Sequence, residues 1–349
     1  MATKVHKGKR GKPLRIAVNG FGRIGRAVAR GIIERKSALI LLAAINDHGS
    51  PEELRDALEF DSNYGRLGSP VVRKGSVLHV DGTKVQTFLE DDPSKLPWKK
   101  HAIDIVIEST GKFTRRQDAL QHIKAGAKQV ILSTYPHGSH AYCPLAGVAP
   151  LDKPDTTFIT HASCTTTAVA PVLNLIRKRV GIQAASLFGV QSVTHSQTVV
   201  DKTRGQGRRR RSALQNIIPV EVDARHSIPA LVPGMNGRFI ASAARVPSPI
   251  VHLAILNVVV KKKITVEKIN QLFTEAEKSV ALKGILATTD DPVVSQDLKQ
   301  HPASGIIDLN MTQVAAGILV QLGVWYDNEW AFSQRLIDLL EKIGSKNAS

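Results

Sequence analysis

The chain has 349 residues, with 47 Lys and Arg against 30 Asp and Glu, a formal net charge of +17, and 42% apolar residues. This length predicts two domains, and the apolar content is enough to bury a core and excludes a disordered polycation. There is no run of about 18 apolar residues, so we expect no membrane partner, and the two cysteines are too few for a disulfide framework.

Residues 1–13 are predicted to form a basic flexible arm, with five Lys or Arg in the first twelve positions. This arm contains no apolar stretch of the kind found in secretory signals, so we expect a cytoplasmic protein. Residues 14–163 then alternate strand and helix patterns. Leu14–Val18 predicts a strand, a glycine-rich turn leads to a helix ending near Arg35, and Leu39–Ile45 has the continuous apolar run of a buried parallel strand.

The same alternation continues along the chain. Strands on either side of Asp81-Gly82 predict a hairpin, and strands are also predicted at 103–107 and 129–132, with a helix near 117–125 between them. Together these elements indicate an α/β fold with a doubly wound, Rossmann-type domain over 14–163.

The pattern changes at about residue 164. A helix is predicted over Cys164–Arg177, and long strand-like runs follow at 185–194, 238–246, 251–260 and 317–326. A helix near 266–276 has apolar residues at helical spacing, as does a last helix over 331–343. We therefore predict an α+β domain over 164–327, with a mostly antiparallel sheet and helices on one face.

A dinucleotide motif lies between the first predicted strand and helix, as Gly20-Phe21-Gly22-Arg23-Ile24-Gly25. Its glycines permit a tight turn and bring backbone N–H groups close to a pyrophosphate at the helix N-terminus. Asp47 follows the second strand, where a carboxylate hydrogen-bonds a ribose 2′-hydroxyl and repels a 2′-phosphate. The motif predicts NAD rather than NADP; the alternative is a structural turn with a loop aspartate. No metal site is predicted.

A candidate nucleophile lies where a strand gives way to a helix, in Ser163-Cys164-Thr165-Thr166. A thiol in the first turn of a helix is near the positive end of the macrodipole, which lowers the thiol pKa. The alternative is a small buried apolar residue, the more common fate of an isolated cysteine.

With these residues in view, the sequence resembles the glyceraldehyde-3-phosphate dehydrogenase family, including its erythrose-4-phosphate branch, from about Leu14 to Gly344. Seven blocks carry the resemblance in order: 19–25 (NGFGRIG), 45–47 (IND), 108–111 (ESTG), 162–166 (ASCTT), 215–219 (QNIIP), 245–247 (RVP) and 325–330 (WYDNEW). The resemblance implies an NAD-binding domain, a catalytic domain, a C-terminal helix over 328–349 that packs back on the NAD domain, and a homotetramer.

The resemblance also implies a mechanism and a set of residue roles. Cys164 adds to a small phosphorylated aldehyde, a hydride passes to NAD, and inorganic phosphate releases the resulting thioester as an acyl phosphate. Beside the glycine motif and Asp47, the implied cofactor contacts are Ser109, Thr110 and Asn328. The implied phosphate contacts are Thr194, Ser196 and Arg245 for the substrate, and Ser163, Thr165, Arg211 and Ser212 for the attacking phosphate. From the residues alone, Thr194 and Ser196 fit ordinary strand positions equally well, and Arg245 fits a surface ion pair.

One position departs from the family. The family has a histidine as general base 27 residues after the nucleophilic cysteine, and the same count from Cys164 leads to Gln191. A glutamine amide donates a hydrogen bond to an oxyanion but cannot accept a proton, and positioned acid–base help is worth about 10²–10⁴ in rate. His195 lies four residues further on. In a continuous strand it is about 13 Å away, so we expect a surface or phosphate-facing histidine rather than a substitute.

Three functions are consistent with the sequence. The first, which we prefer, is an NAD-dependent phosphorylating dehydrogenase of a phosphorylated aldehyde, with low activity as a consequence of Gln191. The second is a catalytically impaired paralogue that binds NAD and sugar phosphate in a regulatory role. The third is a protein that uses Arg208–Arg211 and the basic arm to bind nucleic acid or an acidic partner.

Overall fold

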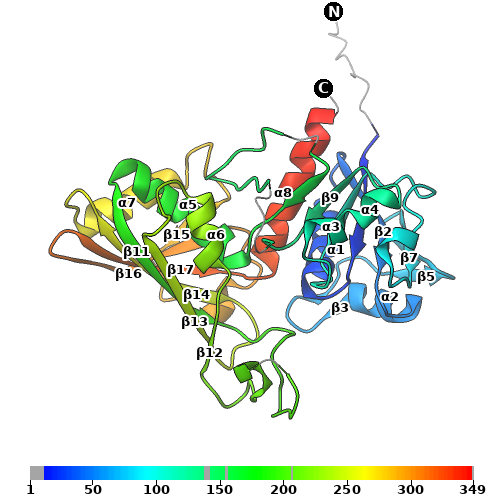
Figure 1. The fold of residues 1–349 in the computed structure, drawn as a ribbon, viewed down its shortest axis with the longest axis horizontal. Helices are drawn as coiled ribbons and strands as arrows, with labels where there is room; N and C mark the ends of the chain where they lie inside the picture. Colours follow the sequence, from blue (N-terminus) through cyan, green and yellow to red (C-terminus); the bar gives the residue numbers. More distant parts are fainter. Residues whose placement is uncertain (1–11, 137–141, 154–155, 206, 348–349) are drawn as a thin grey trace, which may run out of the picture.

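The computed structural model describes residues 12–136, 142–153, 156–205 and 207–347. The predicted basic arm therefore lies outside the described residues except for Lys12 and Pro13. Two large β-sheets, one from each half of the chain, lie on either side of the C-terminal helix α8 (Trp330–Asn347) (Figure 1). The predicted combination of a Rossmann-type α/β half and a mixed α+β half is confirmed.

The first sheet is built from the N-terminal half of the chain. From β10 to β7 its neighbouring strands are parallel, and β7, β6 and β5 are antiparallel. In spatial order its strands are β10 (Phe158–Thr160), β9 (Gln129–Leu132), β8 (Ile105–Glu108), β1 (Leu14–Asn19), β2 (Ile40–Asn46), β7 (Thr83–Phe88), β6 (Val77–Val80) and β5 (Val72–Lys74). A separate pair is formed by β3 (Phe60–Asp61) and β4 (Gly65–Arg66).

The helices of this half are α1 (Arg23–Arg35), α2 (Pro51–Glu59), α3 (Arg116–Ala119) and α4 (Gln121–Lys124). The sequence predicts one helix where α3 and α4 stand as two short ones. It does not predict α2, although Ser50 and Glu53 form a capping box at its start.

Helix α8 packs against α1. A Cβ added to Gly31 lies 2.5 Å from Ile337 Cδ1, so the absence of a side chain at residue 31 allows the two helices to approach closely. Arg35 at the end of α1 pairs with Asp338 at 2.6 Å and Glu341 at 3.0 Å. The last element of the chain is thereby held against the first helix.

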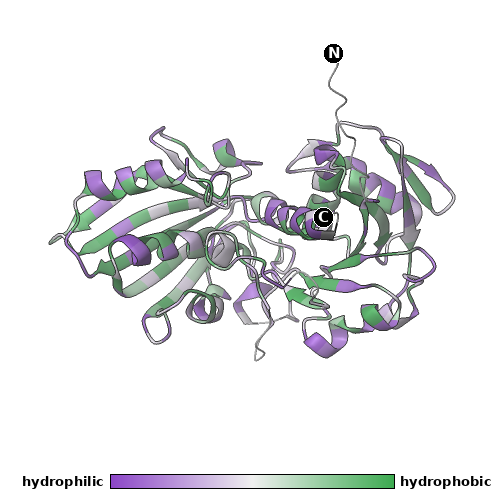
Figure 2. Ribbon diagram, turned by 90° about the horizontal axis from the view of Figure 1, so that it is seen from above, coloured by the Kyte–Doolittle hydropathy of each residue, from purple (hydrophilic) through white to green (hydrophobic). Residues whose placement is uncertain are grey.

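The second sheet is mixed, and most of its pairings are antiparallel. In spatial order its strands are β12 (Ile218–Val220), β13 (Phe239–Arg245), β11 (Ile182–Gln191), β14 (His252–Val260), β17 (Leu319–Tyr326), β16 (Gly305–Ala315) and β15 (Leu286–Thr289). Helices α5 (Cys164–Arg179), α6 (Ala224–Leu231) and α7 (Val266–Ala276) cover one face, called here the inner face (Figure 1). Apolar residues of the strands and helices meet there (Figure 2).

Alternation along β14 shows how this sheet divides its residues between two faces. Every second residue from His252 to Val260 is buried, and the intervening ones are only half-buried. The opposite, outer face carries apolar side chains that are largely open to solvent, such as Phe188 at 43% exposed and Ile240 at 72%. Within the described residues, none of the helices is both long enough and apolar enough to cross a bilayer.

Two features of the second half differ from the prediction. Strand β11 ends at Gln191 instead of continuing to residue 194, and the chain turns through Thr194 and His195. The spacing that separates His195 from position 191 in a continuous strand therefore does not apply. Strand β16 is not predicted, because Asp308, Asn310 and Thr312 interrupt its apolar pattern.

Candidate active site

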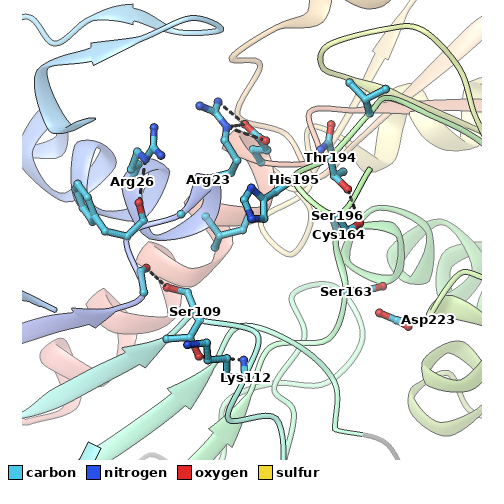
Figure 3. Close-up of a pocket in the computed structure, with 18 of the residues that line it drawn as sticks. Arg23, Arg26, Ser109, Lys112, Ser163, Cys164, Thr194, His195, Ser196 and Asp223 are labelled. Carbon is cyan, nitrogen blue, oxygen red and sulfur yellow. Dashed lines mark hydrogen bonds and ion pairs between the residues drawn. The ribbon is translucent and has the colours of Figure 1, made fainter. Parts of the chain in front are cut away.

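A cavity of about 980 Å³ lies between the two halves of the molecule and is lined by residues from both. Figure 3 shows Arg23, Arg26, Ser109 and Lys112 on one side and Cys164, Thr194 and Asp223 on the other. Such a cavity is large enough for a dinucleotide and a small substrate together. The predicted cofactor and nucleophile positions are thus brought to one place.

The glycine turn at the start of α1 fits a pyrophosphate. Gly20 has φ +91°, and a Cβ there lies 2.5 Å from Thr110 N, so a side chain is excluded on two grounds. A Cβ on Gly25 collides with the carbonyl oxygen of Gly20, which keeps α1 close to β1. An added Cβ on Gly22 meets nothing within 4 Å, and no side chain caps the helix. The first N–H groups of α1 are thereby left for an anionic ligand.

Two further motif residues hold this turn. Asp47, at the end of β2, lines the cavity, and its carboxylate accepts hydrogen bonds from the N–H of Phe21 and, at 2.7 Å, from that of His48. Arg23 also lines the cavity, but its guanidinium is paired with Asp61 and with Glu329, the latter at 2.6 Å. Arg23 therefore contributes its backbone and its packing to the turn, while its charge is already engaged; Ile24 lines the cavity beside it.

The remaining cofactor positions are fixed by buried hydrogen bonds. The Ser109 hydroxyl donates to the Gly20 carbonyl at 2.7 Å, and the Thr110 N–H donates to Glu108 at 2.8 Å. Asn328 is buried, and its Oδ1 accepts from the Val251 N–H at 3.1 Å, so its amide group is held at the cavity wall. All three line the cavity, and with the open helix end and the Asp47 carboxylate they fit NAD.

Cys164 is the first residue of α5. Ser163 caps the helix, with its hydroxyl accepting the Thr166 N–H at 3.2 Å. Burial raises the pKa of the Cys164 thiol to about 11; the nearby Asp223 charge adds to this effect, while hydrogen bonds from Thr165 and the Arg245 charge oppose it. The predicted lowering of the pKa by the helix end is outweighed, because desolvation of the thiolate is the larger effect. The thiol is protonated at neutral pH.

The predicted substrate-phosphate contacts Arg245, Thr194 and Ser196 line the same cavity. This arginine is 7% exposed; its Nη1 donates to the Ser192 carbonyl at 2.6 Å, and its Nε has no hydrogen-bond partner among the described residues. Arg245 is therefore not the surface ion pair that the sequence also allows. Nearby, Thr194 Oγ1 lies 3.2 Å from Ser196 Oγ, which accepts a hydrogen bond from Arg209 Nη1 at 3.0 Å. Arg245, Thr194, Ser196 and Arg209 all line the cavity.

Two predicted phosphate contacts lie elsewhere. Arg211 Nε donates to Asp201 at 2.8 Å, and the Ser212 N–H donates to the same carboxylate at 2.7 Å; neither residue lines the cavity. Arg209 lines the cavity instead of Arg211. The sequence alone does not show which arginine of the run 208–211 faces the cavity, because the four residues are identical. Arg209 also lines a smaller hollow of about 270 Å³ next to Lys202, Arg204 and Arg210.

Gln191 ends β11 beside Arg245 of β13, and it is buried and lines the cavity. The sequence does not single out two other residues of the cavity wall, Asp223 and His252. The only sequence signal for His252 is that it interrupts an apolar run at residues 250–260. Among the described residues, no group of three or more His, Cys, Asp or Glu is arranged to hold a metal ion.

A Rossmann-type half with an open glycine turn, facing a cysteine at a helix start across one cavity, defines an NAD-dependent oxidoreductase. Sequence models of the glyceraldehyde 3-phosphate dehydrogenase NAD binding domain and C-terminal domain match residues 14–116 and 163–328. The chain belongs to the glyceraldehyde 3-phosphate dehydrogenase family, and its cofactor is NAD.

The chain is also similar to glyceraldehyde-3-phosphate dehydrogenases over nearly the whole length of both proteins. A glyceraldehyde-3-phosphate dehydrogenase from Thermotoga maritima is 41% identical over 329 residues, which cover 94% of this chain and 98% of the relative. Proteins of that name from Kitasatospora aureofaciens and Geobacillus stearothermophilus are each 37% identical, over 95% of this chain and 99% of the relative.

Proposed function

We propose that the protein oxidises a small phosphorylated aldehyde of the glyceraldehyde 3-phosphate type with NAD and inorganic phosphate, giving an acyl phosphate. The observation that carries this proposal is the placement of Cys164 in one cavity with the glycine turn and with Arg245, a buried guanidinium whose Nε has no partner among the described residues. A buried cation with an unpaired donor is suited to a phosphate oxygen.

Different residues of the cavity bind the cofactor, the substrate phosphate and the attacking phosphate. Gly22 and the start of α1 hold the pyrophosphate, and Asp47 and Asn328 orient the ribose and the nicotinamide amide. Bound NAD supplies a hydride acceptor. Arg245, Thr194, Ser196 and Arg209 place the substrate phosphate so that its aldehyde carbon meets Cys164 Sγ. We assign the attacking phosphate to Ser163 and Thr165, which lie on either side of Cys164 and line the cavity.

The chemistry begins from a protonated thiol. Since the pKa of Cys164 is raised to about 11, its proton must leave before or as Sγ adds to the aldehyde carbon. The new C–S bond gives a hemithioacetal, which becomes a thioester when the hydride leaves. Inorganic phosphate then attacks the thioester carbonyl and releases the acyl phosphate and Cys164.

The test is a steady-state assay of NADH formation with glyceraldehyde 3-phosphate, NAD and phosphate, repeated with erythrose 4-phosphate to define the aldehyde. Without phosphate, we expect one NADH per active site and then a halt, because the thioester is not released. The absence of NADH with both aldehydes at high enzyme concentration overturns the proposal.

An impaired paralogue is the second candidate, and Gln191 is the observation that favours it. A protein of this kind binds NAD and a sugar phosphate with ordinary affinity but makes no NADH above the rate of a free thiol. Calorimetric titration with NAD, set beside the assay above, separates the two functions. Turnover well above the free-thiol rate excludes the impaired paralogue.

We also propose that the protein is a homo-oligomer, as the family resemblance implies. The outer face of the second sheet exposes Phe188 and Ile240, and Val200 and Ile217 elsewhere in the same half are 67% and 75% exposed. Apolar side chains on an open sheet face are typical of surfaces that another subunit covers. Sedimentation analysis tests this, and a monomer at micromolar concentration contradicts it.

A further inference from the structure

Four side chains form a row across the inner face of the second sheet, at the end nearest Cys164. Gln191 on β11 is paired with Arg245 on β13, and His252 on β14 is paired with Tyr326 on β17. Val190 is opposite Leu253 in the antiparallel pair between β11 and β14, so the next step of that register brings Gln191 opposite His252. We call Arg245, Gln191, His252 and Tyr326 the inner row.

His252 is therefore the cross-strand neighbour of the position that lacks a histidine. Residues directly opposite in an antiparallel pair point to the same face, with Cβ atoms about 4.5–5.5 Å apart. Both Gln191 and His252 are buried and both line the cavity. An imidazole at residue 252 thus occupies the same wall of the same cavity as one at residue 191 would.

The His252 ring has unused hydrogen-bonding capacity. It is 2% exposed, and neither Nδ1 nor Nε2 has a hydrogen-bond partner among the described residues. Its ring contact is edge-on with Tyr326, at 5.2 Å between ring centroids. Buried polar atoms without partners are uncommon in folded proteins and often mark a site where a ligand or a reaction step supplies the partner.

Tyr326 connects His252 to the nucleophile. Its hydroxyl lies 2.9 Å from Thr165 Oγ1, and Thr165 is the residue after Cys164 at the start of α5. The Arg245 charge acts both on the thiol of Cys164 and on the ring of His252. Cys164 and His252 thus each lie within electrostatic reach of Arg245.

We propose that His252 is the general base of this enzyme and does the work that Gln191 cannot do. The proton on Cys164 Sγ moves to a ring nitrogen of His252 as Sγ bonds to the aldehyde carbon, and it returns to the new alkoxide oxygen. His252 takes this proton again from the hemithioacetal hydroxyl as the C=O bond re-forms and the hydride passes to NAD⁺. The imidazolium finally gives the proton to water. Gln191 is left to donate a hydrogen bond to the oxyanion.

Arg245 makes the basicity of His252 depend on bound phosphate. Burial and the Arg245 charge lower the pKa of His252 to about 3. The charged or titratable groups that the structure shows acting on or touching its ring are Arg245 from β13 and Tyr326 from β17, while Gln191 from β11 is neutral. A substrate phosphate on Arg245 offsets the guanidinium charge, so the imidazolium becomes less unfavourable. Proton transfer is thereby favoured when a phosphorylated substrate is in place.

The main test compares His252→Ala with Gln191→Ala in the rate of the first NADH formed after mixing with NAD and glyceraldehyde 3-phosphate. We expect His252→Ala to slow this step about 10²–10⁴-fold, and Gln191→Ala to slow it less than His252→Ala does, because Gln191 supplies only a hydrogen bond to the oxyanion. His161→Asn is the matched control, because the His161 ring is also buried, its nitrogens also have no hydrogen-bond partner within the described part of the chain, and it does not line the cavity. We expect it to retain the wild-type rate.

Three further measurements separate a chemical role of His252 from a structural one. We expect millimolar imidazole to restore part of the rate lost in His252→Ala. We also expect the double variant Gln191→His/His252→Ala to be faster than His252→Ala alone. In the wild-type protein without NAD, we expect inorganic phosphate to accelerate the alkylation of Cys164 by iodoacetamide severalfold. In His252→Asn we expect no such acceleration. This variant keeps a planar polar side chain and serves as the test if His252→Ala does not fold.

The role of His252 rests on the proposed dehydrogenase function, and the outcomes distinguish the two. A wild-type protein that forms no NADH overturns both. A wild-type protein that forms NADH, with His252→Ala and His252→Asn as fast as wild type, overturns the role of His252 alone. So does a larger loss in Gln191→Ala than in His252→Ala.

Discussion

The two walls of the cavity use their polar side chains in opposite ways. On the cofactor wall, Asp47, Ser109, Thr110 and Asn328 all hydrogen-bond to the protein itself. On the catalytic wall, Arg245 Nε and both ring nitrogens of His252 have no partner among the described residues. The side chains of the cofactor wall are held by the protein, whereas these three nitrogens of the catalytic wall are left for substrate and for proton transfer. Preorganisation is thus concentrated where NAD binds.

The largest expected effect is on the catalytic wall. Cys164→Ser removes the thiol that forms the thioester, and a serine hydroxyl of ordinary pKa is not ionised by this site. We expect NADH formation to fall by at least about 10⁴-fold. NAD affinity measured by calorimetry should stay within about twofold of the wild-type value. A variant that keeps more than a hundredth of the activity removes Cys164 from its proposed role.

The next prediction concerns the pH dependence of the same thiol. Because burial raises the pKa of Cys164 to about 11, the thiolate fraction in the unliganded protein rises about tenfold per pH unit between pH 7 and pH 10. Alkylation by iodoacetamide, followed by mass spectrometry of the Cys164 peptide, should rise about 10³-fold over that range. Cys143 provides an internal comparison, since its pKa is also raised to about 11 by burial. A plateau of Cys164 reactivity below pH 8 contradicts the raised value.

Arg245 gives a smaller and more specific effect. Arg245→Met keeps the length of the side chain and removes its charge, so the substrate phosphate loses a charged hydrogen bond worth about 1.5–3 kcal/mol. We expect kcat/KM for glyceraldehyde 3-phosphate to fall about 10- to 100-fold. The unphosphorylated glyceraldehyde is the control substrate, and its kcat/KM should not fall, because it has no phosphate contact to lose and the Arg245 charge that lowers the pKa of His252 is gone. Equal losses for both aldehydes point to a structural role.

The smallest expected effect is on the cofactor wall. Asp47→Asn keeps the acceptor for the Phe21 N–H but removes the negative charge that discriminates against a 2′-phosphate. We expect NAD to bind about tenfold more weakly and NADP to bind more tightly, as measured by calorimetry with each dinucleotide. An unchanged ratio of the two affinities shows that another residue sets the preference.

The sequence predicts the cofactor wall better than the catalytic wall, for a physical reason. Residues 20–25 and Asp47 lie within one β1–α1–β2 unit, where local spacing determines how they meet. The catalytic wall is assembled from β11, β13, β14 and β17, and the register that brings Gln191 opposite His252 is a property of strand pairing across distant segments. The end of β11 at Gln191 and the position of Arg209, rather than Arg211, at the cavity are likewise determined by tertiary structure.

The packing of α8 on α1 has a consequence for how the chain acquires its structure during synthesis. The core of the first sheet contains Phe332, Leu336, Ile337 and Leu340 from the last helix. Domains commonly fold in order as they leave the ribosome. Here the N-terminal half has an open apolar surface until α8 emerges, so completing the dinucleotide-binding half waits for the synthesis of residues 330–347.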